Sequence, residues 1–124
     1  MLTFRVDKDD NILFVNIIGL TPKDKMAEAI ADFTHKCSEL RENFIIINDL
    51  SLYKMHSEHD FEIMCKITQT VLEKFKIGKI IRIVGNNKEY IKKLLHVDKE
   101  MGLKNIHYAT NRKAALETIY KFTH

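Results

Sequence analysis

A short apolar run in the middle of the chain constrains the fold more than any other feature. Residues Phe44 to Ile47 are all large and apolar, and Asn48 and Asp49 follow them directly. A continuous apolar run is typical of a central strand in a parallel sheet, where both faces are covered. Ligands and partners usually meet an α/β sheet just past the carboxyl ends of its strands. The residues after this run are therefore the first place to look for a site.

Helix and strand patterns alternate on both sides of this run. Two β-rich segments around a turn at residues 8–11 predict an N-terminal hairpin that ends near residue 18. Apolar residues at helical spacing predict helices that carry the positions Met26 to Leu40, Phe61 to Phe75, Tyr90 to Val97 and Ala115 to Tyr120. Two further strands are predicted at Ile80 to Val84 and Ile106 to Ala109.

Capping and stop residues mark the predicted helix boundaries. Thr21, which precedes a proline, and Ser57, with Asp60 three residues later, are typical of helix N-termini. Thr110 is predicted to cap the last helix. Gly78 is predicted to stop the second helix.

These elements predict an α/β fold with a single mixed sheet of about five strands and four helices. The N-terminal hairpin supplies the antiparallel pair, and parallel β-α units follow it. The chain has 124 residues, of which 45% are hydrophobic, so one core can form without a disulfide or metal. Residues 1–124 are therefore expected to form a single domain.

Composition narrows the class of protein. The formal charge is +3 and both signs are interspersed, which does not resemble the clustered basic face of a nucleic-acid binder. The N-terminus lacks the pattern of a signal peptide, and no apolar run reaches the length of a membrane span. Cys37 and Cys65 show no pairing or metal-binding spacing, so both are expected to be reduced. We therefore expect a cytoplasmic protein without an integral membrane segment or nucleic-acid partner.

The order of elements resembles the STAS superfamily, the domain of bacterial anti-sigma-factor antagonists, and its SpoIIAA-like relatives. Two segments carry the resemblance: Ile45 to Ser51 is similar to the family's strand ending in Asp-Leu-Ser, and Tyr108 to Leu116 is similar to its last strand and C-terminal helix. The resemblance implies a non-enzymatic regulatory or protein-interaction module. Of the family's phospho-acceptor motif only Ser57 is retained, so a working serine switch is not expected.

Six residues are predicted to share a partner- or ligand-binding rim, because strand-to-helix connections of a parallel sheet emerge at one edge. They are Asp49, Ser51, Ser57, Asn86, Thr110 and Arg112. Each also has a purely local interpretation. Ser57 and Thr110 would serve as helix caps, and Asp49 would close an Asx-type turn.

A second candidate surface is one face of the sheet itself. If sequential strands are neighbours and all helices lie on one face, the other face presents large apolar groups together with Asn and Arg. The predicted ligand or dimer surface consists of Phe14, Asn16, Ile46 and Arg82. The alternative is that one helix crosses over and covers this face.

The sequence does not indicate catalysis or a cofactor. The run from His56 to Asp60 contains four residues of types that bind metals, but a solvated helix start is the favoured explanation and no metal is predicted. The first functional hypothesis is therefore a regulatory module that binds a protein partner or a second copy. The alternative is a carrier of a small apolar, lipid-like ligand held against the sheet.

Overall fold

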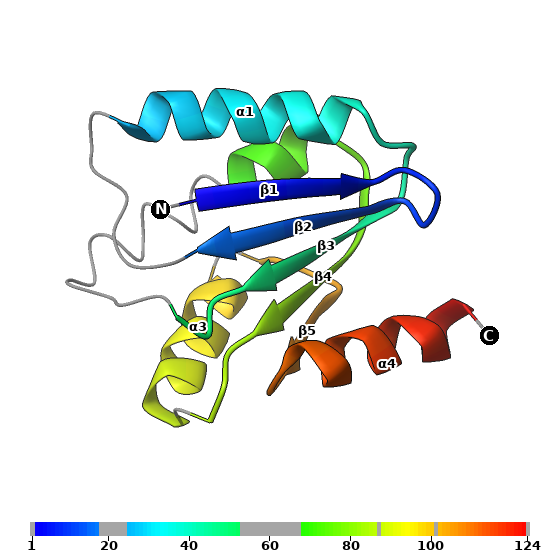
Figure 1. Ribbon diagram of the computed structural model, residues 1–124. Coiled ribbons are helices and arrows are strands. Elements are labelled where there is room, and N and C mark those ends of the chain that lie inside the picture. Colours follow the sequence, from blue (N-terminus) through cyan, green and yellow to red (C-terminus); the bar gives the residue numbers. More distant parts are fainter. Residues whose placement is uncertain (1, 18–24, 53–67, 87, 101, 124) are drawn as a thin grey trace.

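The computed structural model describes residues 2–17, 25–52, 68–86, 88–100 and 102–123. The described elements are β1 (Leu2–Asp7), β2 (Ile12–Ile17), α1 (Met26–Ser38), β3 (Phe44–Asp49), β4 (Ile77–Ile83), α3 (Lys88–Glu100), β5 (Ile106–Ala109) and α4 (Arg112–Thr123) (Figure 1). Residues 68–74, between β3 and β4, are also helical. Over the described residues the fold is α/β, with one mixed sheet and four helices, as the sequence predicted.

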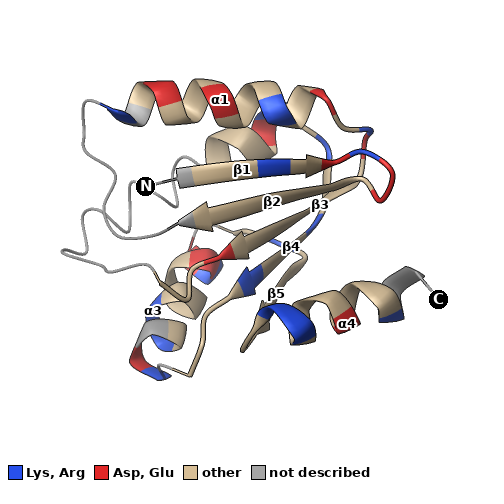
Figure 2. Ribbon diagram, viewed as in Figure 1, with Lys and Arg blue, Asp and Glu red and all other residues tan. Residues whose placement is uncertain are grey.

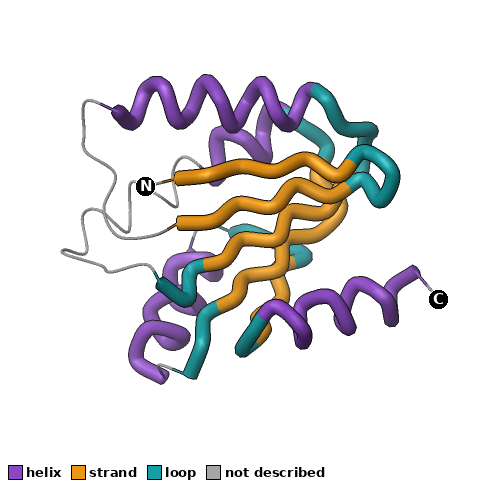
Figure 3. Tube along the Cα trace, viewed as in Figure 1, coloured by secondary structure: helices purple, strands orange, loops and turns teal. Residues whose placement is uncertain are grey.

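The described part of the chain forms a five-stranded sheet in the order β1-β2-β3-β4-β5, so neighbours in the sequence are also neighbours in the sheet (Figure 3). β1 is antiparallel to β2, and every later pair is parallel. The carboxyl ends of β2 to β5 therefore meet at one edge. The turn of the β1-β2 hairpin lies at the opposite edge, where the parallel strands begin.

The register divides the side chains between two faces that are covered differently. On the first face, Leu13 and Ile46 pack with residues of α1, α3 and the helix at 68–74. On the second face, Ile47 and Ile81 pack with Ala115 of α4 and its neighbours. We call these the three-helix face and the α4 face. Figure 1 shows α4 beside the end of the sheet that carries β4 and β5.

The predicted ligand surface does not exist as one surface. Phe14 pairs with Ile47 across β2 and β3, whereas Ile46 pairs with Leu13. Phe14 and Asn16 thus belong to the α4 face, and Ile46 and Arg82 belong to the three-helix face. The prediction was wrong by one residue in the pairing of β2 with β3, and a one-residue slip moves a whole strand's side chains to the other face.

The predicted end of the second helix at Gly78 is also wrong. Gly78 lies inside β4, and the helical residues before it end at 74. A Cβ atom on Gly78 would lie 2.6 Å from the carbonyl oxygen of Asn43, which itself has a φ of 64°. The glycine is therefore required by the close approach of two backbones at the start of the sheet.

Candidate functional site

The predicted rim residues lie at the carboxyl ends of three neighbouring parallel strands. Asp49 ends β3 and Ser51 follows it, Asn86 follows β4, and Thr110 follows β5. Ser51, Asn86 and Thr110 are exposed, and Asp49 is partly buried. The structure therefore places these four residues at one edge of the sheet. Ser57 lies outside the described residues.

Asp49 and Ser51 form a closed turn. The Oδ1 atom of Asp49 accepts hydrogen bonds from the backbone N–H of Ser51 at 3.1 Å and from its hydroxyl at 2.6 Å. Leu50, between them, is 1% exposed and donates its N–H to the carbonyl of Ile83 at 2.8 Å. This is the Asx-type turn that the sequence offered as the local interpretation.

The same turn presents a large apolar side chain that the sequence-based prediction overlooked. Leu52 is 61% exposed, directly after Ser51. Because Leu50 anchors the turn to the sheet and Asp49 fixes Ser51, the backbone leading to Leu52 is held in place. Periodicity in the sequence does not detect Leu52, because this residue belongs to no described helix or strand.

The cap of α4 differs from the prediction by one residue. The Oδ1 atom of Asn111 accepts the backbone N–H of Ala114 at 2.8 Å, and α4 begins at Arg112. Asn111 is thus the N-cap, and Thr110 is an exposed residue of the preceding connection. The prediction failed because both residue types cap helices well and the sequence pattern does not locate a helix start to one residue.

The guanidinium of Arg112 lies over the ring of Phe14 on the α4 face. It lies 5.9 Å from the centroid of the Phe14 ring, and the guanidinium of Arg5 lies 4.0 Å from the same centroid. Asn16 pairs in register with Asp49, so it reaches the rim from β2. The structure thus separates the predicted sheet-face residues, and it brings Asn16 close to the rim instead.

Arg82 is a core residue rather than a surface residue. Its side chain is fully buried, and it donates to the two carboxylate oxygens of Asp98 on α3, from Nε at 3.1 Å and from Nη2 at 2.8 Å. The hydroxyl of Tyr108 donates to the same carboxylate. The Nη1 atom of Arg82 and the Oδ1 atom of Asn48 are buried without a hydrogen-bond partner among the described residues. The bidentate pair satisfies most of a buried charge and ties β4 to α3.

The described residues give little support to redox or metal chemistry. Burial raises the pKa of the Cys37 thiol to about 12, which keeps it protonated and unreactive at neutral pH. Within the described ranges, no group of three His, Cys, Asp or Glu residues is placed to hold a metal ion. The predicted run from His56 to Asp60, like Cys65, lies outside those ranges.

The overall surface is mixed in charge. Figure 2 shows basic and acidic residues on the described helices and loops, with both signs on α1, α3 and α4. None of the helices that the structure describes is long and apolar enough to cross a membrane.

Comparison with known proteins does not assign the chain to a group. No protein-family model matches its sequence, and no curated protein matches it either. The resemblance of Ile45 to Ser51 and of Tyr108 to Leu116 to STAS segments therefore stays a prediction. What the structure establishes is the α/β fold and an exposed rim at the carboxyl edge of its sheet.

Proposed function

We propose that this chain is a non-enzymatic, STAS-like interaction module of the cytoplasm that binds a protein partner through its rim. From here on the rim denotes Asp49, Ser51, Leu52, Asn86 and Thr110. It gains the exposed Leu52, and it omits Ser57, which lies outside the described residues, and Arg112, which lies near Phe14. Partner-binding residues are commonly carried by loops on a rigid scaffold, and these loops follow the neighbouring parallel strands β3, β4 and β5. The described residues of the rim are polar apart from Leu52, which suits a small apolar anchor surrounded by polar contacts.

The observation that carries this proposal is the turn from Asp49 to Leu52. A single leucine that is 61% exposed is not unusual, because apolar residues contribute much of the surface of any folded protein. Here, however, the leucine follows a turn that is fixed by two hydrogen bonds to Asp49 and by the buried side chain of Leu50. A rigid, exposed anchor loses less conformational entropy on binding than a mobile one.

The Ser51 hydroxyl is engaged in this turn. It donates to Asp49 at 2.6 Å, so in this arrangement it holds the loop. This use of Ser51 supports a contact surface in preference to a nucleophile. The alternative function, binding of a small apolar ligand, required Phe14 and Ile46 to share one surface. These residues lie on opposite faces of the sheet, so that support is absent.

The experiment compares proteins captured by tagged wild type with those captured by two rim variants, Leu52→Asp and Ser51→Arg. The matched control is Leu95→Asp on α3, since Leu95 is 48% exposed and lies outside the rim. Captured proteins are quantified by mass spectrometry, and thermal melts confirm that every variant is folded. We expect the amount of one specific captured partner to fall at least about tenfold in the rim variants and to stay unchanged in the control.

Equal recovery of every captured protein by wild type and by both rim variants would show that the rim is not the binding surface. Loss of the same partner in the Leu95→Asp control would also contradict the proposal, because that variant leaves the rim intact.

A further inference from the structure

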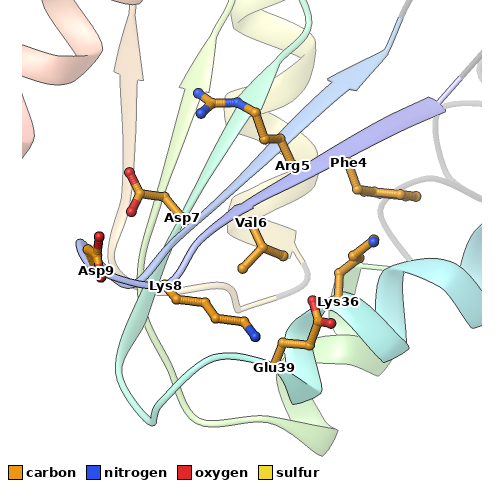
Figure 4. A pocket seen from close by; sticks show the side chains of 8 residues that line it. All are labelled: Phe4, Arg5, Val6, Asp7, Lys8, Asp9, Lys36 and Glu39. Atoms are coloured by element: carbon orange, nitrogen blue, oxygen red, sulfur yellow. The ribbon is translucent and has the colours of Figure 1, made fainter.

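A hollow runs along the outer edge of β1, at the end of the sheet opposite the rim (Figure 4). Its volume is about 600 Å³, and it is lined by Phe4, Arg5, Val6, Asp7, Lys8, Asp9, Lys36 and Glu39. In Figure 4, the side chains of Val6 and Lys8 point toward Lys36 and Glu39 of the α1 region, whereas Arg5 and Asp7 point to the other side of the strand. A hollow lined from both faces of one strand must follow that strand's edge.

This edge has no neighbouring strand among the described residues. Within that part of the chain β1 pairs only with β2, so half of its backbone N–H and C=O groups point toward the hollow. Edge strands are usually protected by charges that repel a second strand. The charges on β1 are of opposite sign, however, and they alternate in a way that permits pairing.

The charge pattern of the edge is self-complementary. Arg5 and Asp7 lie two residues apart on the α4 face, and neither forms an ion pair with another described residue. Lys36 and Glu39, which are three residues apart on the wall of the hollow, also carry charges of opposite sign. A second copy turned by a two-fold rotation about Val6 would therefore place Arg5 opposite Asp7 and Asp7 opposite Arg5.

We propose that the occupant of this hollow is β1 of a second copy of the chain, which extends the sheet through an antiparallel β1–β1 pair. The pairing places Val6 opposite Val6 of the second copy. Arg5 then faces Asp7 of the second copy, and Asp7 faces Arg5, on the same side of the joined sheet. This register keeps each copy's α4 face aligned with that of the other, which antiparallel pairing about a two-fold axis requires.

The pairing supplies both components of a strand-addition interface. Backbone hydrogen bonds use the edge groups of β1 that pair with no described strand, and the cross-strand ion pairs select the register. Because the hollow lies at the hairpin end of the sheet, the rim stays open in the dimer. The proposal is therefore independent of the partner-binding function, and either can fail without the other.

The test uses charge reversal in the full chain. Arg5→Asp leaves two acidic residues on each edge, and Asp7→Arg leaves two basic residues there. Each variant alone should repel itself, whereas an equimolar mixture should pair, because an edge with two acidic residues then faces an edge with two basic residues. The control Lys92→Asp makes the same charge change as Arg5→Asp at an exposed position on α3, away from the hollow.

Sedimentation equilibrium between about 10 µM and about 1 mM covers the range in which weak complexes dissociate. We expect wild type and the Lys92→Asp control to reach twice the monomer mass within this range. Each edge variant alone should associate at least about tenfold more weakly, since two attractive pairs become repulsive. The mixture should regain the dimer.

Three results would overturn the proposal. The first is a wild-type chain that stays monomeric up to about 1 mM, which would leave the hollow to an extended segment of another protein. The second is a dimer that persists unchanged in both single variants. The third is a mixture that stays monomeric while thermal melts show both variants folded, a check needed because Asp7 also accepts the N–H of Asp10 in the hairpin turn.

Discussion

At the scale of the residue, the most consequential group is the buried ion pair of Arg82 and Asp98. A buried charge is tolerated when its hydrogen bonds are satisfied, and the carboxylate of Asp98 accepts hydrogen bonds from Arg82 and from Tyr108. The pair joins a central strand to α3, so it specifies how α3 lies on the sheet. Its counterpart on the surface is the His96–Glu100 pair, whose side chains are 70% and 67% exposed.

Arg82→Ala should therefore be strongly destabilising. The variant leaves the carboxylate of Asp98 buried without its cation, which costs about 3–5 kcal/mol of the free energy of unfolding. The measurement is urea denaturation followed by circular dichroism. Glu100→Ala removes one partner of the exposed pair and should change stability by less than about 0.5 kcal/mol. Similar losses for the two variants would mean that the Arg82–Asp98 pair is not buried.

At the scale of the element, the ends of helices and strands decide details that periodicity leaves open. α4 begins after Asn111 because the Asn111 side chain satisfies the N–H of Ala114. β4 begins earlier than its apolar run because Gly78 lets the chain pass close to Asn43. In both cases a single local contact moves a boundary within the uncertainty of any pattern-based assignment.

Asn111→Ala should lower the free energy of unfolding by about 1 kcal/mol, because the cap hydrogen bond to α4 is lost. Thr110→Ala is the matched control, and it should be neutral within about 0.5 kcal/mol because Thr110 is exposed and is not the cap. Chemical denaturation of both variants provides the measurement. The assignment of the cap fails if the Thr110 variant is the less stable of the two.

At the scale of the whole molecule, the two faces of the sheet are covered unequally. α1, α3 and the helix at 68–74 cover one face, and within the described chain α4 is the helix packed on the other. Ile119 of α4 is 9% exposed against the sheet, whereas Leu116, one turn earlier, is 44% exposed. The contribution of α4 to the core therefore rests on few side chains.

Ile119→Ala should cost about 2–4 kcal/mol, because it opens a cavity beneath the helix that covers the α4 face. Leu116→Ala on the same helix should cost less than about 1 kcal/mol, since much of that side chain is already in water. Thermal and urea denaturation of the two variants test this difference. If Leu116→Ala proves as costly as Ile119→Ala, then α4 packs on the sheet through a different side from the one described.

Much of the candidate site followed from local signals. Asp49 and Ser51 stood after an apolar run, so their place at the carboxyl edge was predictable from the order of strands and helices. Asp98 and Tyr108 were not predictable as partners of Arg82, because hydrogen bonds between distant segments leave no local periodicity. The exposure of Leu52 depends on how a turn is anchored, which its own residue type does not reveal.

The sequence by itself determined the strands and helices and the parallel sheet with its N-terminal hairpin, since alternating apolar patterns and crossover connections leave few topologies open. Tertiary structure alone decided which residues share a face. Adjacent residues of a strand point to opposite sides, so the pairing of β2 with β3 separated Phe14 from Ile46 and placed Arg82 in the core. It also formed the hollow along β1 from two separate segments of the chain. The order of the strands in the sheet, which leaves β1 on the outside, is set only when the chain folds.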